Sequence, residues 1–471
     1  MKIQDLTIAQ AHQGLVNKEF SSVELCKAYL EKIREKDKDI FAFLSVTEET
    51  ALEQAEEVDD IIKRGENIPV LAGIPCAVKD NIMVEGLKCT AASKILENYV
   101  APYEATVVRK LKKEKAVILG KTNLDEFAMG ASGENSAFGP TKNSCDLTRV
   151  TGGSSSGSAA AVAADMAVYA LGSDTAGSIR YPASFCGVVG LKPTYGAVSR
   201  FGLIAMASSL DQIGPLAKNI DDCKIVFDAI RGKDQMDSTS VDMRVENNGL
   251  KIKGLKIGVP KEYFVKGVDK EVEKIVKEAI KKYEAMGAKT MEVSLPHTDY
   301  AIATYYIIMP CEISANLARY DGIKYGYQDK SGNDLMEVYL RSRGRGLGDE
   351  VRRRIILGTY ALSSGYYDAY YLKAQKVRTL IRQDFEKVFK KVDVLMTPVA
   401  PTPAFKLGEK IKDLLQMYLC DVFTGPVSLA GLPAVSLPVG KVDNLPVGLQ
   451  IIGKPFEEDK ILEISKLYGN N

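Results

Sequence analysis

The stretch TGGSSSGSAAAVAA, residues 151–164, decides how the fold of this chain is interpreted. A run of Gly and Ser alone is typical of a flexible linker. Here the run leads straight into an alanine-rich segment, and because alanine favours helices most strongly, we expect a helix from about residue 155. The apolar segment MAVYALG, residues 166–172, then predicts a strand. The serines therefore indicate the start of a helix in an α/β unit rather than a tether.

This helix and strand bring distant polar residues to one edge of a sheet. The helix runs away from its N-terminus and the strand returns antiparallel to it, so Ser154 and Ser178 lie at the same edge. That edge carries the carboxyl ends of the strands, where open α/β sheets place their functional sites. Lys79 ends another strand-like run, VLAGIPCAVK, and can reach the same edge.

A serine nucleophile at this edge needs a base, and the histidines are poor candidates. His12 lies in a predicted helix and His297 in SLPHTDY, and we expect both to be surface or structural residues. A lysine can act as the base when burial lowers its pKa toward neutrality. Because neighbouring strand positions point to opposite faces, Asp80 need not pair with Lys79. A lysine alone is usually solvated, so this hypothesis depends on its combination with the two serines.

The composition is that of a soluble globular protein. Hydrophobic residues make up 46% of the 471 residues and charged residues 26%. Lys and Arg together number 62 against 61 for Asp and Glu, so the chain has no overall positive field that could hold a nucleic acid. We therefore expect any RNA contact to be local or to come from a partner.

The cysteines and the apolar segments indicate a reduced, cytoplasmic protein. The eight cysteines include no Cys-x-x-Cys pair, which excludes zinc-ribbon and thioredoxin spacings, and we expect buried free thiols. The first residues, MKIQDLTIAQAH, contain no apolar signal core. The most apolar stretch, AAAVAADMAVYALG, is too short to span a bilayer.

The order of predicted elements indicates a mixed α/β fold in one domain spanning residues 1–471. Residues 1–70 have helical periodicity. Residues 71–215 alternate short apolar runs with helix-like segments, which favours an α/β sheet. A mainly helical segment follows at about 269–390, and the strand-like sequence of 391–455 completes the sheet.

Lys79, Ser154 and Ser178 resemble the signature of the amidase-signature family. That signature is a lysine, a bridging serine in Gly-Gly-Ser-Ser, and a nucleophilic serine in an Asp-Thr-x-Gly-Ser-Ile-Arg run, here DTAGSIRYP. The resemblance covers nearly the whole chain and implies a large mixed β-sheet covered on both faces by helices. Within the family, the chain is most similar to the A subunits of bacterial aspartyl/glutamyl-tRNA amidotransferases, through KDNI, GKTNLDEFAMGASGENSAFGP, KPTYGAVSRFGLIAMASSLDQIGP and LGTYALSSGYYDAYY.

The resemblance implies a glutaminase with a Ser-Ser-Lys triad. Ser178 would attack the side-chain amide of glutamine, form a γ-glutamyl ester and release ammonia. Ser154 would relay the proton between Ser178 and a neutral Lys79, and the Gly153–Ser154 peptide would be cis. The developing oxyanion would be bound by backbone N–H groups of the loop that holds the nucleophile, namely those of Thr175, Ala176, Gly177 and Ser178. Asp174 would brace this loop.

Glutamine recognition would use residues far along the chain. Arg354 aligns with the family's arginine for the α-carboxylate and Asp421 with its aspartate for the α-ammonium group. Tyr305 would add a hydroxyl contact, although Tyr306 next to it leaves the register open. Taken alone, RSRGRGLGDEVRRR is more typical of a solvated basic loop, which could also contact tRNA.

The resemblance also implies partners. The chain would form a heterotrimer with B and C subunits, and tRNA would bind mainly through the B subunit. The partner would bind ATP and Mg, and no cofactor or metal is expected in this chain, which lacks Gly-x-x-x-x-Gly-Lys-Ser/Thr. No membrane contact is expected. Ammonia would then convert Glu-tRNA(Gln) or Asp-tRNA(Asn) to Gln-tRNA(Gln) or Asn-tRNA(Asn).

Three departures from the family pattern leave the triad intact. Ser156 replaces the second glycine of the usual Gly-Gly-Ser-Ser-Gly-Gly-Ser, and Thr151 stands where proline is common. The sequence also ends soon after ILEISKLYGNN, shorter than typical members.

Two alternative functions stay open. A stand-alone amidase would be fully active without partners and would not prefer glutamine. A non-catalytic phosphate-binding or scaffold protein could use the Gly/Ser loop at a helix N-terminus and would have no amidase activity to lose.

Overall fold

The computed structural model describes residues 5–242, 252–264, 267–410 and 413–469. Within them, strands from both ends of the chain form one mixed sheet of 11 strands, in the order β1-β3-β2-β6-β8-β7-β12-β13-β11-β9-β10. The bounds of these strands are β1 Phe43–Val46, β2 Pro75–Lys79, β3 Val117–Thr122, β6 Tyr169–Asp174, β7 Val189–Lys192, β8 Gln212–Ala217, β9 Lys256–Pro260, β10 Lys289–Val293, β11 Val394–Pro398, β12 Ala434–Val442 and β13 Leu445–Ile452. A separate hairpin pairs β4 (Lys142–Asn143) with β5 (Asp146–Val150).

The centre of the sheet places the predicted site residues at one edge. β2 pairs in parallel with both β3 and β6, so the carboxyl ends of the three strands lie together. Lys79 is the last residue of β2 and Asp174 the last residue of β6. Every residue of β2 and β6 is buried, which requires cover on both faces of the sheet and explains why each strand is mainly apolar before its last residues.

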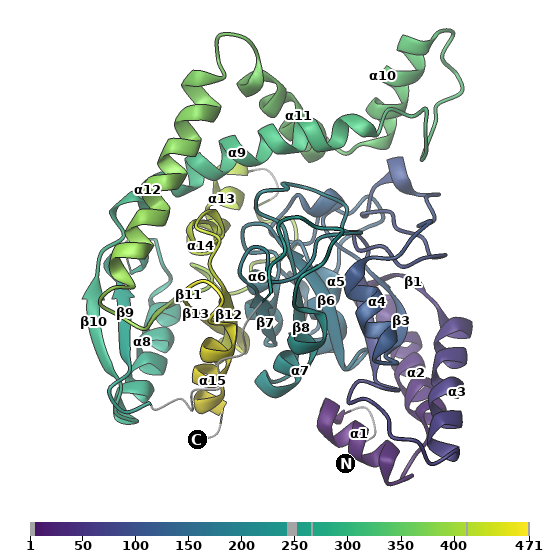
Figure 1. Ribbon diagram of the computed structural model, residues 1–471. Helices are drawn as coiled ribbons and strands as arrows, with labels where there is room; N and C mark the ends of the chain where they lie inside the picture. The colour runs from purple at the N-terminus through teal and green to yellow at the C-terminus, as the bar shows by residue number, and fades with distance from the viewer. Residues whose placement is uncertain (1–4, 243–251, 265–266, 411–412, 470–471) are drawn as a thin grey trace.

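Helices cover the sheet and confirm the predicted α/β fold. Their bounds are α1 Ile8–Val16, α2 Ser22–Ile40, α3 Glu48–Lys63, α4 Thr106–Lys113, α5 Ser156–Ala163, α6 Arg180–Cys186, α7 Ile220–Ile230, α8 Lys270–Ala285, α9 Ala301–Asn316, α10 Leu335–Gly346, α11 Asp349–Leu362, α12 Lys373–Val388, α13 Leu414–Tyr418, α14 Gly425–Leu429 and α15 Glu458–Gly469. α5 and α6 pack on each other and on the central strands, while α15 packs on α7, α8 and β12. Figure 1 shows both chain ends on the side of the molecule opposite to α9, α10 and α11.

The opening stretch folds as a buried helix. α5 begins at Ser156, within one residue of the predicted start, and its small residues are buried on every side. Because its side chains are small, α5 packs closely against the elements that surround it. A buried helix is expected to have no polar face. The strand predicted at 166–172 begins later, at Tyr169, because the chain turns through Asp165 with a φ of 61° before it enters β6.

Two organisational predictions need correction. Residues 1–70 are not only helical, because β1 lies among them and pairs with β3. RSRGRGLGDEVRRR is not a basic loop: it forms the end of α10, a short turn and the start of α11, because Asp349 and Glu350 support the first turn of a new helix.

The cysteines are free thiols, and all but Cys145 are buried, as expected. Throughout the described residues, each helix is too short or too polar to cross a lipid bilayer.

Candidate active site

Lys79 lies at the centre of the site among hydroxyl groups. Its side chain is fully buried, and its Nζ is 2.8 Å from Ser154 Oγ, 2.9 Å from Ser155 Oγ and 3.0 Å from Ser173 Oγ. Asp80 does not pair with it, because Asp80 points the other way and forms an ion pair with Lys121 of β3 at 2.9 Å. Strand alternation thus removes the neighbouring carboxylate from the lysine.

The electrostatics of this site favour a neutral amine. Burial lowers the pKa of Lys79 to about 7, and the more distant carboxylates of Asp125, Asp174 and Asp211 oppose this shift without cancelling it. A neutral amine has a lone pair, so it can accept a proton from a bound hydroxyl group. The structure therefore supplies a base without imidazole.

Ser154 lies just before α5 and is held there by a buried acidic residue, Asp125. The Gly153–Ser154 peptide is cis, and the carbonyl of Ser154 accepts the Asp125 N–H at 3.3 Å. The Asp125 carboxylate accepts the N–H groups of Gly133 at 3.0 Å and Asn135 at 2.9 Å. A Cβ on Gly153 would lie 2.0 Å from Asp125 Oδ2, so only glycine fits beside this carboxylate. Sequence reasoning missed Asp125, although it lies in the quoted motif GKTNLDEF.

Ser178 lies in a loop between β6 and α6 that Asp174 braces as expected. Asp174 accepts the N–H of Ile179 at 3.1 Å and forms a buried ion pair with Arg180 at 3.0 Å. Burial opposes ionisation of Asp174, but Arg180 outweighs it and lowers the pKa of this carboxyl. The carbonyl of Ser178 accepts the Ser155 N–H at 3.0 Å, which joins the loop to the start of α5.

This backbone contact joins Ser178 to the residue that follows Ser154. Among the described residues, no hydrogen bond joins the hydroxyls of Ser154 and Ser178, so the proton relay between them stays a prediction. Ser178 is 6% exposed while Ser154 is fully buried, so the predicted nucleophile is the one of the two that solvent can reach.

The predicted oxyanion loop has free donors. In the described part of the chain, no backbone acceptor binds the N–H of Thr175, Ala176, Gly177 or Ser178. The loop is nevertheless fixed in place, because the Tyr181 N–H donates to the Gly177 carbonyl at 2.7 Å. A Cβ on Gly177 would lie 2.4 Å from Thr424 Oγ1, so glycine allows this close approach.

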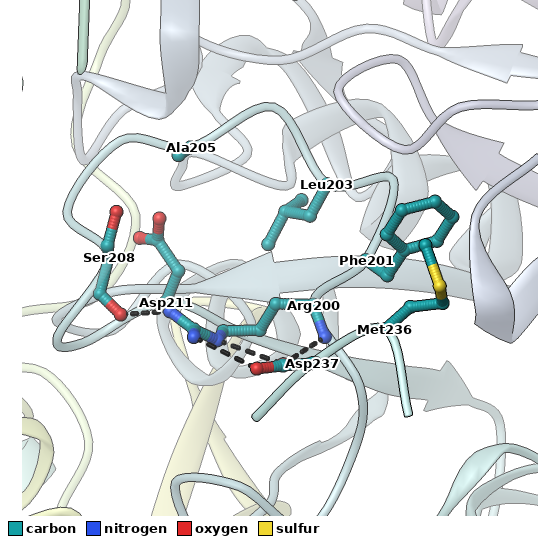
Figure 2. Close-up of a pocket in the computed structure, with 8 residues that line it drawn as sticks. All are labelled: Arg200, Phe201, Leu203, Ala205, Ser208, Asp211, Met236 and Asp237. Atoms are coloured by element: carbon teal, nitrogen blue, oxygen red, sulfur yellow. Dashed lines mark hydrogen bonds and ion pairs between the residues drawn. The ribbon is translucent and has the colours of Figure 1, made fainter. Parts of the chain in front are cut away.

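Asp211 supports the other side of this loop and was not singled out from the sequence. Its carboxylate accepts the Thr175 hydroxyl at 2.7 Å and the N–H groups of Met206 and Ala207. Burial raises its pKa to about 6. Asp211 also lines a pocket of about 220 Å³. Figure 2 shows the residues that line it, which are Arg200, Phe201, Leu203, Ala205, Ser208, Asp211, Met236 and Asp237.

The residues predicted to bind glutamine come together from three segments. Asp421 lies three residues before Thr424, the residue that contacts Gly177, and the charges of Asp174 and Arg180 act on it. Tyr306 of α9 donates its hydroxyl to Asp421 Oδ2 at 3.1 Å, and burial raises the pKa of Asp421 to about 6.

Arg354 of α11 lies in an aromatic cradle next to Asp421. Its guanidinium is 5.5 Å from the ring of Tyr306 and 5.7 Å from that of Tyr418. Its Nε donates to Glu350 Oε1 at 2.7 Å. Tyr305 is buried with its ring edge-on to Tyr306, and the tyrosine that contacts Asp421 is Tyr306. A substrate contact by Tyr305 stays a prediction.

The two histidines lie outside this cluster. His297 Nδ1 hydrogen-bonds Asp384 of α12 at 2.8 Å, which ties two helical segments together. His12 lies on α1, near the N-terminus. Ser156, which departs from the family pattern, donates to Thr141 Oγ1 at 3.2 Å and does not touch Lys79.

Comparisons with known proteins agree with this geometry. The family model described as Amidase matches residues 24–462. The A subunit of glutamyl-tRNA(Gln) amidotransferase from Carboxydothermus hydrogenoformans is 56% identical over 100% of this chain and 98% of that protein. A protein of the same name from Caldanaerobacter subterraneus is 57% identical over 99% and 96%. The crystal structure of the same protein from Thermotoga maritima superimposes with a TM-score of 0.83 at 44% identity, covering 100% of this chain and 96% of that one. The chain therefore belongs to the amidase family, in the branch formed by the A subunits of glutamyl-tRNA(Gln) amidotransferases.

Proposed function

We propose that this chain hydrolyses glutamine by a Ser-Ser-Lys mechanism and supplies ammonia to a tRNA-dependent amidotransferase. The observation that carries the proposal is the buried amine of Lys79, 2.8 Å from Ser154 Oγ and with a pKa lowered to about 7. This arrangement offers a base for serine chemistry where neither histidine is near. The names of the relatives support glutamyl-tRNA(Gln) as the final acceptor.

The chemistry begins with attack on the glutamine amide. Ser178 Oγ bonds to the amide carbon while its proton passes to Ser154 and the Ser154 proton passes to Lys79. The oxyanion is stabilised by the free N–H groups of the 175–178 loop. The C–N bond then breaks, the proton returns from Lys79 through Ser154 to the leaving nitrogen, and ammonia departs. Water attacks the γ-glutamyl ester by the same route, releasing glutamate and restoring the Ser178 hydroxyl.

Selectivity for glutamine is assigned to the pair Arg354 and Asp421. Arg354 would bind the α-carboxylate through the nitrogens that Glu350 does not occupy, and the forked guanidinium suits a carboxylate. Asp421 would bind the α-ammonium group, with Tyr306 holding its carboxylate in place. An amide that lacks both α-groups would lose these contacts.

The chain is proposed to act in the cytoplasm within a heterotrimer with B and C subunits. The partner would bind ATP and Mg and activate the tRNA-linked carboxylate, and tRNA would contact mainly the B subunit. A near-zero net charge of +1 supports this division of labour, because this chain alone lacks the positive field that binds nucleic acid.

Glutaminase activity with and without partner subunits tests this function. We expect ammonia release from glutamine by the co-purified complex, with lower release by the isolated chain, because a glutaminase that supplies a partner wastes substrate when it acts alone. Glutamine should be preferred to primary amides that lack the α-carboxylate and α-ammonium groups. Full activity of the isolated chain on such amides would instead favour the stand-alone amidase.

The pH dependence should follow Lys79 and Asp421. A lysine is the active base only when neutral, so kcat should fall as the pH drops through about 7, the pKa of Lys79. The KM for glutamine should rise below about pH 6, because Asp421 then becomes protonated and no longer binds the α-ammonium group of the substrate as an ion pair. Steady-state kinetics from about pH 5 to 9 check both the fall in kcat and the rise in KM. A kcat that stays constant through this range would contradict a lysine base.

A further inference from the structure

The turn between α10 and α11 is anchored to the core by a buried acid that the mechanism does not use. Gly348, the N-cap of α11, donates its N–H to both carboxylate oxygens of Glu126, at 3.2 and 3.0 Å. Glu126 is 3% exposed and lies between β3 and the β4–β5 hairpin, outside the helical segment that it contacts. The N-terminus of a helix favours such a negative group.

Further contacts make this anchor a built feature. The Ser93 hydroxyl hydrogen-bonds the Glu126 carboxylate and lies 3.2 Å from the Gly346 carbonyl. A Cβ on Gly346 would lie 2.7 Å from Ile95, so the turn rests on the core without a gap. A Cβ on Gly348 would lie 2.2 Å from Glu126 Oε2, so the close contact requires glycine at this position.

The anchored helix carries the proposed carboxylate-binding residue. Arg354 lies six residues after Gly348, about 9 Å along the axis of α11. The far half of the helix rests on α9, where a Cβ on Gly358 would lie 1.8 Å from the Pro310 carbonyl. α9 and α11 therefore pack as one unit, and the Glu126 contact ties this unit to the part of the chain that holds Lys79 and the serines.

We propose that Glu126 is a positioning residue for substrate specificity: through the Gly348 N–H it sets the position of α11 and so places Arg354 over the α-carboxylate of glutamine. The inference rests on the proposed glutaminase function. It predicts that loss of the anchor weakens recognition of the carboxylate while the Ser178 chemistry continues, because the contacts that hold Ser154 come from Asp125 and not from the Glu126 side chain.

The test compares two substrates in the full chain purified with its partner subunits. Glutamine carries the α-carboxylate, and 4-aminobutanamide is glutamine without it. Glu126→Ala should raise the KM for glutamine about tenfold, because Arg354 is then no longer held in position, while kcat changes less than about twofold. The rate with 4-aminobutanamide should not change. Glu126→Gln keeps an oxygen that can accept the Gly348 N–H, so it should restore most of the wild-type KM.

Glycine variants test the contact itself. Gly348→Ala should raise the KM for glutamine because its Cβ displaces the carboxylate, and combining it with Glu126→Ala should add little, since the two changes remove one contact. Gly344→Ala is the matched control: a Cβ there meets nothing within 4 Å, so KM should stay at the wild-type value. The Gly348 series also decides the question if Glu126→Ala does not fold.

Two results would overturn the inference: an unchanged KM for glutamine in Glu126→Ala and Gly348→Ala, or an equal loss with both substrates. Either result leaves the proposed function standing, provided the wild-type complex releases ammonia from glutamine. If the wild type releases none, the proposed function itself fails, and the two failures are thereby distinguished.

Discussion

Ser178→Ala is expected to abolish ammonia release from glutamine while leaving the fold intact. The Ser178 oxygen is the atom that would form the γ-glutamyl ester, and the hydroxyl of Thr175 in the same loop is bound to Asp211. Loss of a serine nucleophile that acts as one unit with its base typically lowers kcat by about a millionfold. The Ser178 side chain makes no hydrogen bond in the described structure, so its removal should not destabilise the loop that Asp174 and Arg180 hold. Ammonia release by the purified complex and a thermal melt measure the two expectations.

A nearby serine serves as the control for this variant. Ser156 is fully buried, two residues from Ser154, yet among the described residues its hydroxyl hydrogen-bonds Thr141 and no residue of the proposed triad. Ser156→Ala should therefore keep near wild-type turnover. Substantial activity in Ser178→Ala would mean that another group is the nucleophile, and a loss in Ser156→Ala of the same size would mean that the site tolerates no change near α5.

Lys79→Met is expected to have the second largest effect. Removing the amine leaves Ser154 without a base and should lower kcat by about ten-thousandfold, the upper range for general base catalysis. Lys79→Arg should be as inactive, because a guanidinium stays charged at every accessible pH and cannot accept a proton. If the lysine contributed only positive charge, arginine would restore part of the activity. Single-turnover ammonia release distinguishes the two cases.

Lys110 provides a matched lysine outside the site. It is half-buried on α4, and its Nζ donates to the carbonyls of Ile230 at 3.0 Å and Arg231 at 2.5 Å. Lys110→Met should leave kcat unchanged, although it removes these bonds and lowers thermal stability. A fall in kcat as large as that of Lys79→Met would show that loss of a hydrogen-bonded lysine outside the site also damages the enzyme.

Local sequence was sufficient to predict the central elements. The alanine-rich run after TGGSSS predicts α5, and the apolar run ending at Lys79 predicts β2, because both signals depend on neighbours in the chain. The resemblance to amidases supplied the roles of Lys79, Ser154 and Ser178, which spacing alone could not assign. The bounds of β6 were missed by a few residues, because the chain first turns at Asp165 with a φ of 61°, where the N–H of Met166 donates to the carbonyl of Ala161 at the end of α5.

The sequence by itself determined the mixed α/β fold, and its resemblance to amidases pointed to the three residues of the proposed triad. Only the tertiary structure decided which groups surround them: that Asp80 pairs with Lys121 and leaves Lys79 among hydroxyls, and that Tyr306 rather than Tyr305 contacts Asp421. The physical reason is that burial and pairing arise between residues of different elements. A pKa of about 7 for Lys79 exists only where the fold removes both water and neighbouring carboxylates from the amine.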